Sequence, residues 1–171
     1  MITLYDIKIE TPIGTLEACT TDKGIYKIHF LDDTRDEDVN PIILTKKAVS
    51  RHNIHPYLHA LQDQMEDYFT RKQTRFDVPL DIQGTEFQKK VWKELLHIPY
   101  GKTRSYLEQT KAIGDPLAIR AVANANGKNP IAIVIPCHRV IGSDGSLTGY
   151  AGGLQRKRWL LDFERGQMSM L

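Results

Sequence analysis

The chain has 171 residues, of which 41% are hydrophobic and 26% charged, enough for one medium domain or two small ones with a packed core. It contains neither an apolar run near the roughly 18 residues of a membrane-spanning helix nor a secretory leader, so a cytoplasmic protein is expected. Its two cysteines exclude a disulfide framework.

Charge is divided unevenly along the chain. The net charge is only +2, but residues 1–85 carry 10 Lys/Arg against 14 Asp/Glu, whereas residues 86–171 carry 13 against 7. A basic C-terminal half suits a polyanionic partner, although chance variation of solvated surface would give the same counts. Charge alone leaves both interpretations open.

The first part of the chain is predicted to be rich in strands. Three segments have the composition of short strands: residues 2–9, 15–20 and 24–30. Apolar residues at helical spacing predict one helix over residues 55–69, followed by a connection and an edge strand over residues 70–79. This strand-rich domain is expected to end at residue 83.

The second part is predicted to be mainly helical. Thr85 and Gln88 form a capping box that opens a helix ending before Pro99. The apolar stripe expected to be buried on this helix consists of Phe87, Val91, Trp92, Leu95 and Leu96. A last helix is expected over residues 153–163, with Gly166 past its end.

Two short helices between these match a helix-turn-helix. Ser105 and Glu108 repeat the capping box, and Asp115 with Pro116 is expected to start a second helix that ends at Gly127. The face expected to pack inward consists of Ala118, Ala121, Val122 and Ala125. The side chains expected to project away from it are Leu117, Arg120 and Asn124. An ordinary αα-hairpin would have the same pattern.

The most informative stretch is Pro136-Cys137-His138-Arg139, which follows a run of β-branched residues. A nucleophilic cysteine needs a nearby base or positive field, because the thiolate is the reactive form. Neighbouring side chains on a strand point to opposite faces, so His138 can serve Cys137 only if the backbone turns or a water bridges them. The second cysteine, Cys19, is expected to be an ordinary strand residue.

An ordered series of motifs surrounds this stretch: Gly101-Lys-Thr-Arg-Ser-Tyr106, Ile119-Arg-Ala-Val-Ala-Asn124, Gly127-Lys-Asn-Pro130, Gly149-Tyr-Ala-Gly-Gly-Leu154 and Lys157-Arg-Trp-Leu-Leu161. The series closely resembles the O6-alkylguanine-DNA alkyltransferases, single-use proteins that move alkyl groups from guanine to their own cysteine. The N-terminal half matches more loosely. The resemblance implies an α+β fold: a strand-rich, ribonuclease H-like domain over 1–83, then a mostly helical DNA-binding and alkyl-acceptor domain with a wing over 84–171.

The resemblance also implies catalytic roles. Cys137 would be the alkyl acceptor, His138 its general base through a water, and Glu164 the group that orients His138. Tyr106 would donate a proton to the leaving guanine, and Asn129 would brace the segment before the cysteine. A solvated helix carboxylate is the alternative for Glu164.

Roles in binding follow from the same resemblance. Arg120 would enter the base stack and replace the flipped nucleotide. The other residues expected at the DNA are Ala121, Asn124, Lys128 and Arg139. The residues expected around the base pocket are Val140, Tyr150, Ala151 and Lys157. Asn126 stands where some relatives carry a bulkier apolar residue. The expected partner is double-stranded DNA containing O6-alkylguanine, with O4-alkylthymine left open, and the expected state is a monomer without a membrane partner.

No metal and no cofactor is expected. His52, His55 and His59 are spaced like one helical face, but Pro56 interrupts it and no further ligand completes a tetrahedral set. No phosphate-binding or dinucleotide-binding glycine loop is present. Two other functions stay open: a module that binds alkylated DNA without repairing it, which the presence of Cys137 disfavours, and a cysteine hydrolase, which would turn over.

Overall fold

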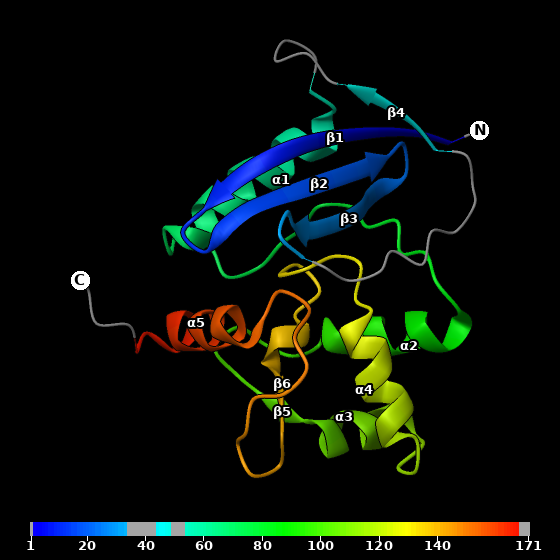
Figure 1. Ribbon diagram of the computed structural model, residues 1–171, viewed down its shortest axis with the longest axis vertical. Coiled ribbons are helices and arrows are strands. Elements are labelled where there is room, and N and C mark those ends of the chain that lie inside the picture. Colours follow the sequence, from blue (N-terminus) through cyan, green and yellow to red (C-terminus); the bar gives the residue numbers. More distant parts are fainter. Residues whose placement is uncertain (1, 34–43, 49–53, 168–171) are drawn as a thin grey trace. The chain divides into compact units, whose positions relative to one another are not determined.

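The computed structural model describes residues 2–33, 44–48 and 54–167, and the chain divides between Gln83 and Gly84 into two compact units (Figure 1). Each unit has its own buried core, so the α+β class predicted from the sequence is confirmed. None of the helices in the described ranges is long and apolar enough to cross a membrane.

The N-terminal unit is a four-stranded sheet covered by one helix. Its strands are β1 (Ile2–Thr11), β2 (Gly14–Thr21), β3 (Gly24–Phe30) and β4 (Leu44–Ala48), in the order β3-β2-β1-β4. β1 pairs antiparallel with β2 and β2 with β3, whereas β4 joins the edge of β1 in parallel. The three predicted strands are confirmed, and β4 was missed.

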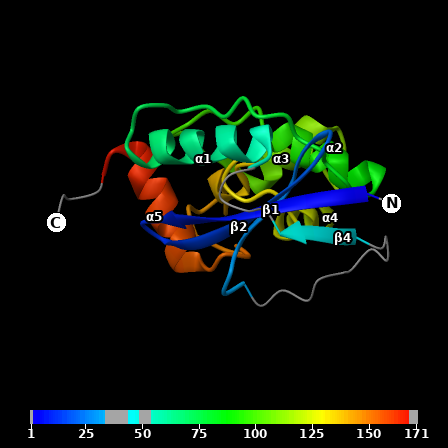
Figure 2. The same ribbon diagram turned by 90° about the horizontal axis from the view of Figure 1, so that it is seen from above.

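The helix α1 (Pro56–Phe69) runs along one face of this sheet (Figures 1 and 2). It buries Leu58, Leu61, Met65 and Tyr68, as its helical spacing predicted. His55 caps its start: its Nδ1 accepts the amide of Tyr57, and Pro56 occupies the first helical position. Within the described part of segment 70–79 there is no strand, and a single bridge joins Ile25 to Leu80 instead.

The C-terminal unit is built on three helices that pack against one another: α2 (Glu86–Leu95), α3 (Tyr106–Ile113) and α4 (Ile119–Gly127). Both predicted capping boxes are present, at Thr85 and at Ser105. On α2 the expected stripe is only partly buried, because Phe87 is 37% exposed and Leu96, past the helix end, 43% exposed.

The helix-turn-helix differs in detail from its prediction. Gly114 ends α3 in the left-handed conformation, with φ of 93°. The side chain of Asp115 caps a turn, accepting the amide of Leu117, so α4 begins at Ile119 rather than at Pro116. Of the face expected to pack inward, Val122 and Ala125 are buried but Ala121 is exposed, and the buried stripe of α4 consists of Val122, Ala125 and Asn126.

The remaining segment carries the cysteine. Cys137–Arg139 is a single 3₁₀ turn, and the β-branched run before it is a buried irregular segment rather than a strand. β6 (Val140–Ile141) pairs in parallel with β5 (Arg104–Ser105), a two-residue contact that the sequence did not predict. A loop with a turn at Gly145 (φ 82°) follows, and α5 (Leu154–Arg165) ends at Gly166.

Candidate active site

Cys137 is held at the start of its 3₁₀ turn by the side chain of Asn129. Asn129 is buried, and its Nδ2 donates to the carbonyl of Ile135 at 2.7 Å and to Sγ of Cys137 at 3.2 Å. Its Oδ1 accepts the amide of Ile131 at 3.0 Å. One amide therefore fixes the segment and gives the sulfur a hydrogen-bond donor, which favours a thiolate. Cys137 is half-buried, whereas Cys19 is buried in β2, as expected for a strand residue.

His138 lies inside the unit and bonds to Glu164. The 3₁₀ turn buries its ring completely, and Nε2 lies 2.8 Å from Oε1 of Glu164 on α5. Burial lowers the pKa of His138, and the attraction of Glu164 opposes that shift without cancelling it. A neutral ring that donates from Nε2 leaves Nδ1 as a base, and Nδ1 has no hydrogen-bond partner within the described residues.

Arg139 was expected at the DNA, but its side chain is engaged inside the unit. It is only 7% exposed, and it donates from Nε to Oε2 of Glu164 at 2.8 Å and from Nη2 to Oε1 at 2.9 Å. Its Nη1 donates to the carbonyl of Ile98 at 2.7 Å, and its guanidinium lies over the ring of Tyr100. A guanidinium bonded in this way does not reach a phosphate.

Glu164 is the centre of this buried network. Burial by itself raises the pKa of Glu164, but the bonds from His138 and Arg139 outweigh it and hold the pKa well below its usual value. The amide of Gly101 adds a fourth bond, to Oε2 at 3.3 Å. Gly101 has φ of 72°, and a Cβ there would lie 3.1 Å from the carbonyl oxygen of Glu164, so the position requires glycine.

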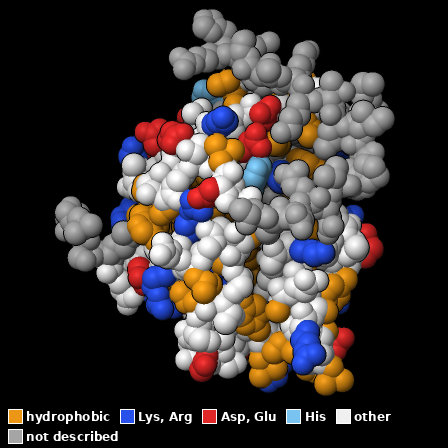
Figure 3. Space-filling view, viewed as in Figure 1, with side chains coloured by type: hydrophobic (Ala, Val, Ile, Leu, Met, Phe, Trp, Pro, Cys, Tyr) orange, Lys and Arg blue, Asp and Glu red, His pale blue; other side chains and the backbone are white. Residues whose placement is uncertain are grey.

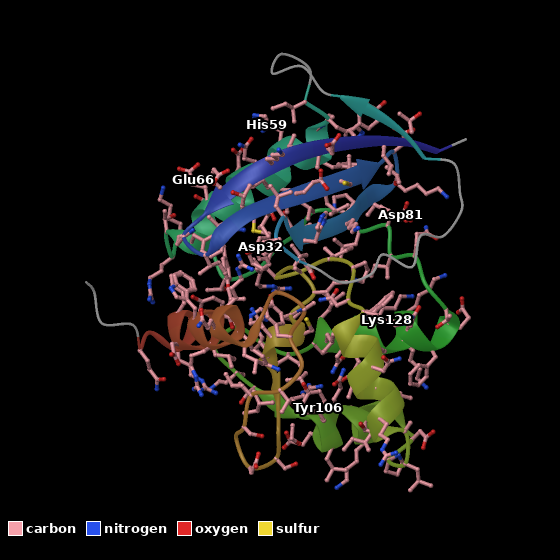
Figure 4. All side chains as sticks on the ribbon, viewed as in Figure 1. Asp32, His59, Glu66, Asp81, Tyr106 and Lys128 are labelled. Carbon is pink, nitrogen blue, oxygen red and sulfur yellow. The ribbon has the colours of Figure 1, made fainter. Side chains whose placement is uncertain are left out.

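Tyr106, at the start of α3, meets Lys157 of α5 at the carbonyl of Thr148 (Figure 4 labels Tyr106). The hydroxyl of Tyr106 donates to that carbonyl at 3.0 Å, and Nζ of Lys157 donates to it at 2.8 Å. Lys157 was expected at the pocket rim, but it is wholly buried, and burial lowers its pKa to about 8. Burial also raises the pKa of Tyr106, so the phenol stays protonated.

The other residues expected around the base pocket lie in the segment after the cysteine. Val140 is buried in β6, Tyr150 is buried in the following loop, and Ala151 is half-buried beside it. The shared contact at Thr148 ties this loop to α3 and α5 just before Tyr150. The loop therefore ends against the same elements that carry Tyr106 and Lys157.

The residues expected at the DNA on α4 lie on its exposed side: Arg120, Ala121 and Asn124. Lys128 is also exposed but stands at the opposite end of the helix from Arg120, beyond its last turn (Figure 4). Near the α3–α4 turn, Figure 3 shows hydrophobic side chains beside Lys and Arg. The exposed hydrophobic residues of these helices and their turn are Leu107, Leu117 and Ile119.

Two contacts in this unit escaped the sequence interpretation. Gln109 of α3 and Asn126 of α4 are buried and exchange two hydrogen bonds, at 2.8 and 2.7 Å. Polar residues at core-facing helical positions are a signal that could have been used for this pair. The carbonyl of Thr148 could not have been found, because any residue type supplies one.

No group of three or more His, Cys, Asp or Glu side chains that could hold a metal ion is present in residues 2–33, 44–48 and 54–167. His55 caps α1 and His59 pairs with Asp63 at 3.3 Å, so both have local roles. His52 lies outside the described residues.

Fold and site together define a class: an α+β protein with a helix-turn-helix and a cysteine beside a buried His–Glu–Arg network. Comparison with known proteins identifies the family. Residues 4–82 match the 6-O-methylguanine DNA methyltransferase ribonuclease-like domain, and residues 86–166 match the DNA binding domain of the same name.

Full-length relatives agree. The methylated-DNA–protein-cysteine methyltransferase of Mycobacterium bovis is 60% identical over 93% of this chain and 91% of that protein. The methyltransferase of the same name from Methanosarcina barkeri is 46% identical over 96% of this chain and 98% of that protein. The crystal structure of Mycobacterium tuberculosis OGT in complex with DNA is 43% identical, covers 96% of this chain and 94% of that chain, and has a TM-score of 0.79. This chain belongs to the 6-O-methylguanine DNA methyltransferase family.

Proposed function

We propose that this protein repairs DNA by moving the alkyl group of O6-alkylguanine to Sγ of its own Cys137, once per molecule. The observation that carries the proposal is a half-buried thiol that accepts a hydrogen bond from Asn129 and directly precedes His138, which is buried and bonded to Glu164. The bond between carbon and O6 breaks as the bond between carbon and sulfur forms. Because a thioether has no easy leaving route, the protein is consumed.

The thiolate arises by loss of the thiol proton to His138. Nε2–H of the neutral imidazole bonds to Glu164, so Nδ1 accepts the proton, through a water between the two side chains. Glu164 then stabilises the imidazolium. The roles in this Cys–His–Glu relay are those of a hydrolase triad: nucleophile, base and orienting carboxylate. A water bridges Cys137 and His138, because side chains adjacent in sequence do not face each other directly.

The leaving guanine needs a proton on its ring, and Tyr106 is the proposed donor. Its hydroxyl now donates to the carbonyl of Thr148, so it must turn toward a bound base. Lys157 lies 3.5 Å from that hydroxyl and holds the same carbonyl, which keeps the phenol oriented. Val140, Tyr150 and Ala151 are the proposed pocket walls.

The proposed partner is double-stranded DNA, bound by the unit of residues 84–171, with residues 1–83 as a separate domain. Arg120 occupies the space of the extruded nucleotide, and Ala121 and Asn124 contact the groove, since all three are exposed on α4. The relative crystallised with DNA supports this partner. We also propose a cytoplasmic location, because a reactive thiol needs a reducing environment.

Intact mass after incubation with duplex DNA carrying O6-methylguanine tests the proposal. The expected result is one added methyl group per protein, located on Cys137 by peptide mapping. Cys137→Ser should transfer nothing, because an alcohol is a far weaker nucleophile, yet should still bind the duplex. The matched control Cys19→Ser should transfer normally, because Cys19 is buried in the other unit.

Each contrary outcome would indicate a different function or a different acceptor residue. Repeated release of repaired guanine without a mass change would indicate a hydrolase. Binding of alkylated duplex by the intact protein without any transfer would indicate a binding module. Methyl transfer by Cys137→Ser would mean that Cys19 is the acceptor.

A further inference from the structure

Arg139, next to the proposed general base His138, uses all three nitrogens of its guanidinium in hydrogen bonds. Two of its nitrogens bond to the two carboxylate oxygens of Glu164 in parallel, at 2.8 and 2.9 Å. Its third nitrogen bonds to the carbonyl of Ile98 at 2.7 Å, just past α2. The carboxylate is thereby fixed in its plane and anchored to a part of the unit distant in sequence.

The orientation of Glu164 decides which nitrogen of His138 carries the proton. Oε1 receives Nε2–H of His138 and also Nη2–H of Arg139, while Oε2 receives Nε–H of Arg139 and the amide of Gly101. If the carboxylate turned, Nε2 would lose its acceptor inside a buried site. Arg139 therefore holds the acceptor that keeps Nδ1 of His138 available as the base.

Charge supports the same role. The charged or titratable groups that act on His138 are Glu164 and Lys157 from α5 and Arg139 from its own turn, and Cys137 precedes it in the chain. Of these only Glu164 favours an imidazolium, whereas Arg139 and Lys157 both oppose it. Without the guanidinium, the buried carboxylate would face His138 with less opposition.

We propose that Arg139 is a positioning residue for alkyl transfer: its guanidinium clamps Glu164 so that His138 stays neutral with Nδ1 as the base. The inference rests on the proposed function. It replaces the DNA contact expected for Arg139 and extends the Cys–His–Glu relay by one residue. A lysine cannot make the two parallel bonds, although it keeps the charge.

Two substitutions separate charge from geometry. Arg139→Gln removes both, so His138 should bind its proton more tightly, and a higher pH should be needed to free the base. Arg139→Lys keeps the charge and loses the clamp, so its pH dependence should lie between those of Arg139→Gln and wild type. The matched control is Arg104→Gln, which breaks another arginine–carboxylate pair of the same unit, with Glu94 at 2.6 Å.

The experiment measures two rates across pH for these variants and wild type, at a temperature where thermal melting shows each to be folded. One is single-turnover methyl transfer from duplex DNA, and the other is carboxamidomethylation of Cys137 by iodoacetamide, read by peptide mass. The expected result is that both midpoints move up by about one pH unit in Arg139→Gln and less in Arg139→Lys, with Arg104→Gln unchanged.

Unchanged midpoints in both Arg139 variants, with only a lower melting temperature, would overturn the proposal, because they would indicate a merely structural role. An equal shift in Arg104→Gln would overturn it too. If Arg139→Gln does not fold, Arg139→Lys decides on its own. The iodoacetamide measurement needs no DNA. If wild type transfers no methyl group but the Arg139 variants still shift the pH profile of the thiol, the proposed function is rejected and the role of Arg139 is retained.

Discussion

At the scale of single residues, the backbone before the thiol is strained. Ile133 has φ of 70°, a left-handed conformation that a β-branched residue rarely adopts and that costs of the order of 1–3 kcal/mol. Ile131, Ile133 and Ile135 are all buried, and Asn129 bonds to both ends of this short segment. Burial and one amide therefore hold the segment in a shape that lets Cys137 start a 3₁₀ turn.

Arg120 offers the sharpest test of base extrusion. Its side chain is exposed on the first turn of α4, so we expect Arg120→Ala to leave the chemical site intact. Transfer from duplex substrate should slow by about tenfold or more, while transfer from free O6-benzylguanine should change little, because only the duplex requires extrusion. Single-turnover rates on both substrates measure this.

Equal losses on both substrates would mean that Arg120 supports the fold or the chemistry instead. Asn124→Ala, on the same exposed side of α4, serves as the control for loss of a simple groove contact. It should weaken duplex binding without the large selective loss in rate.

At the scale of elements, the two helices of the helix-turn-helix are joined by polar as well as apolar contacts. The amides of Gln109 and Asn126 exchange two bonds in the buried layer between α3 and α4. Trp92 of α2 adds a bond from Nε1 to the carbonyl of Ala125 at 2.8 Å. These directional bonds fix how α4 lies against its neighbours more tightly than apolar packing alone.

Breaking the amide pair from one side should destabilise the unit. Asn126→Leu leaves Gln109 buried without its partner, and we expect a loss of about 1–3 kcal/mol in unfolding free energy. Gln109→Leu should behave alike. The double variant should recover most of the loss, because two apolar groups leave no unsatisfied amide. Chemical denaturation of the four proteins measures the coupling, and additive losses would show that the two amides act independently.

At the scale of the whole molecule, positive charge gathers in the part of the chain that carries the thiol. Residues 86–171 hold 13 of the 23 Lys/Arg and 7 of the 21 Asp/Glu. Several of those cations are already engaged within the unit, Arg139 with Glu164 and Arg104 with Glu94. The cations available to DNA are therefore fewer than the sequence count suggests.

The salt dependence of DNA binding tests this distinction. Lys102 and Arg104 both lie just before α3, but Lys102 is exposed, whereas Arg104 is half-buried and paired with Glu94. Lys102→Gln should make the slope of log affinity against log salt shallower by about one unit, and Arg104→Gln should leave it nearly unchanged. Titrations of unrelated unmodified duplexes at several salt concentrations measure both slopes. A strong preference for one sequence, or affinity indifferent to salt, would contradict general surveillance of DNA.

Local features of the fold were predictable because neighbours in sequence create them. The capping boxes at Thr85 and Ser105 and the glycine past the last helix, Gly166, stand where expected. Pairings between segments distant in sequence, β4 with β1 and β5 with β6, were not predictable. The start of α4 was placed too early, because Asp115 caps a turn as readily as a helix.

The sequence by itself determined the family and the α+β class, since both depend on the identity and order of motifs such as Pro136-Cys137-His138-Arg139. Only the tertiary structure decided which charges are buried. It bonded Arg139 to Glu164 inside the unit, and it enclosed Lys157 beside Tyr106. The physical reason is that burial and hydrogen bonding arise from contacts between α3, α5 and the 3₁₀ turn, which no single stretch of sequence contains.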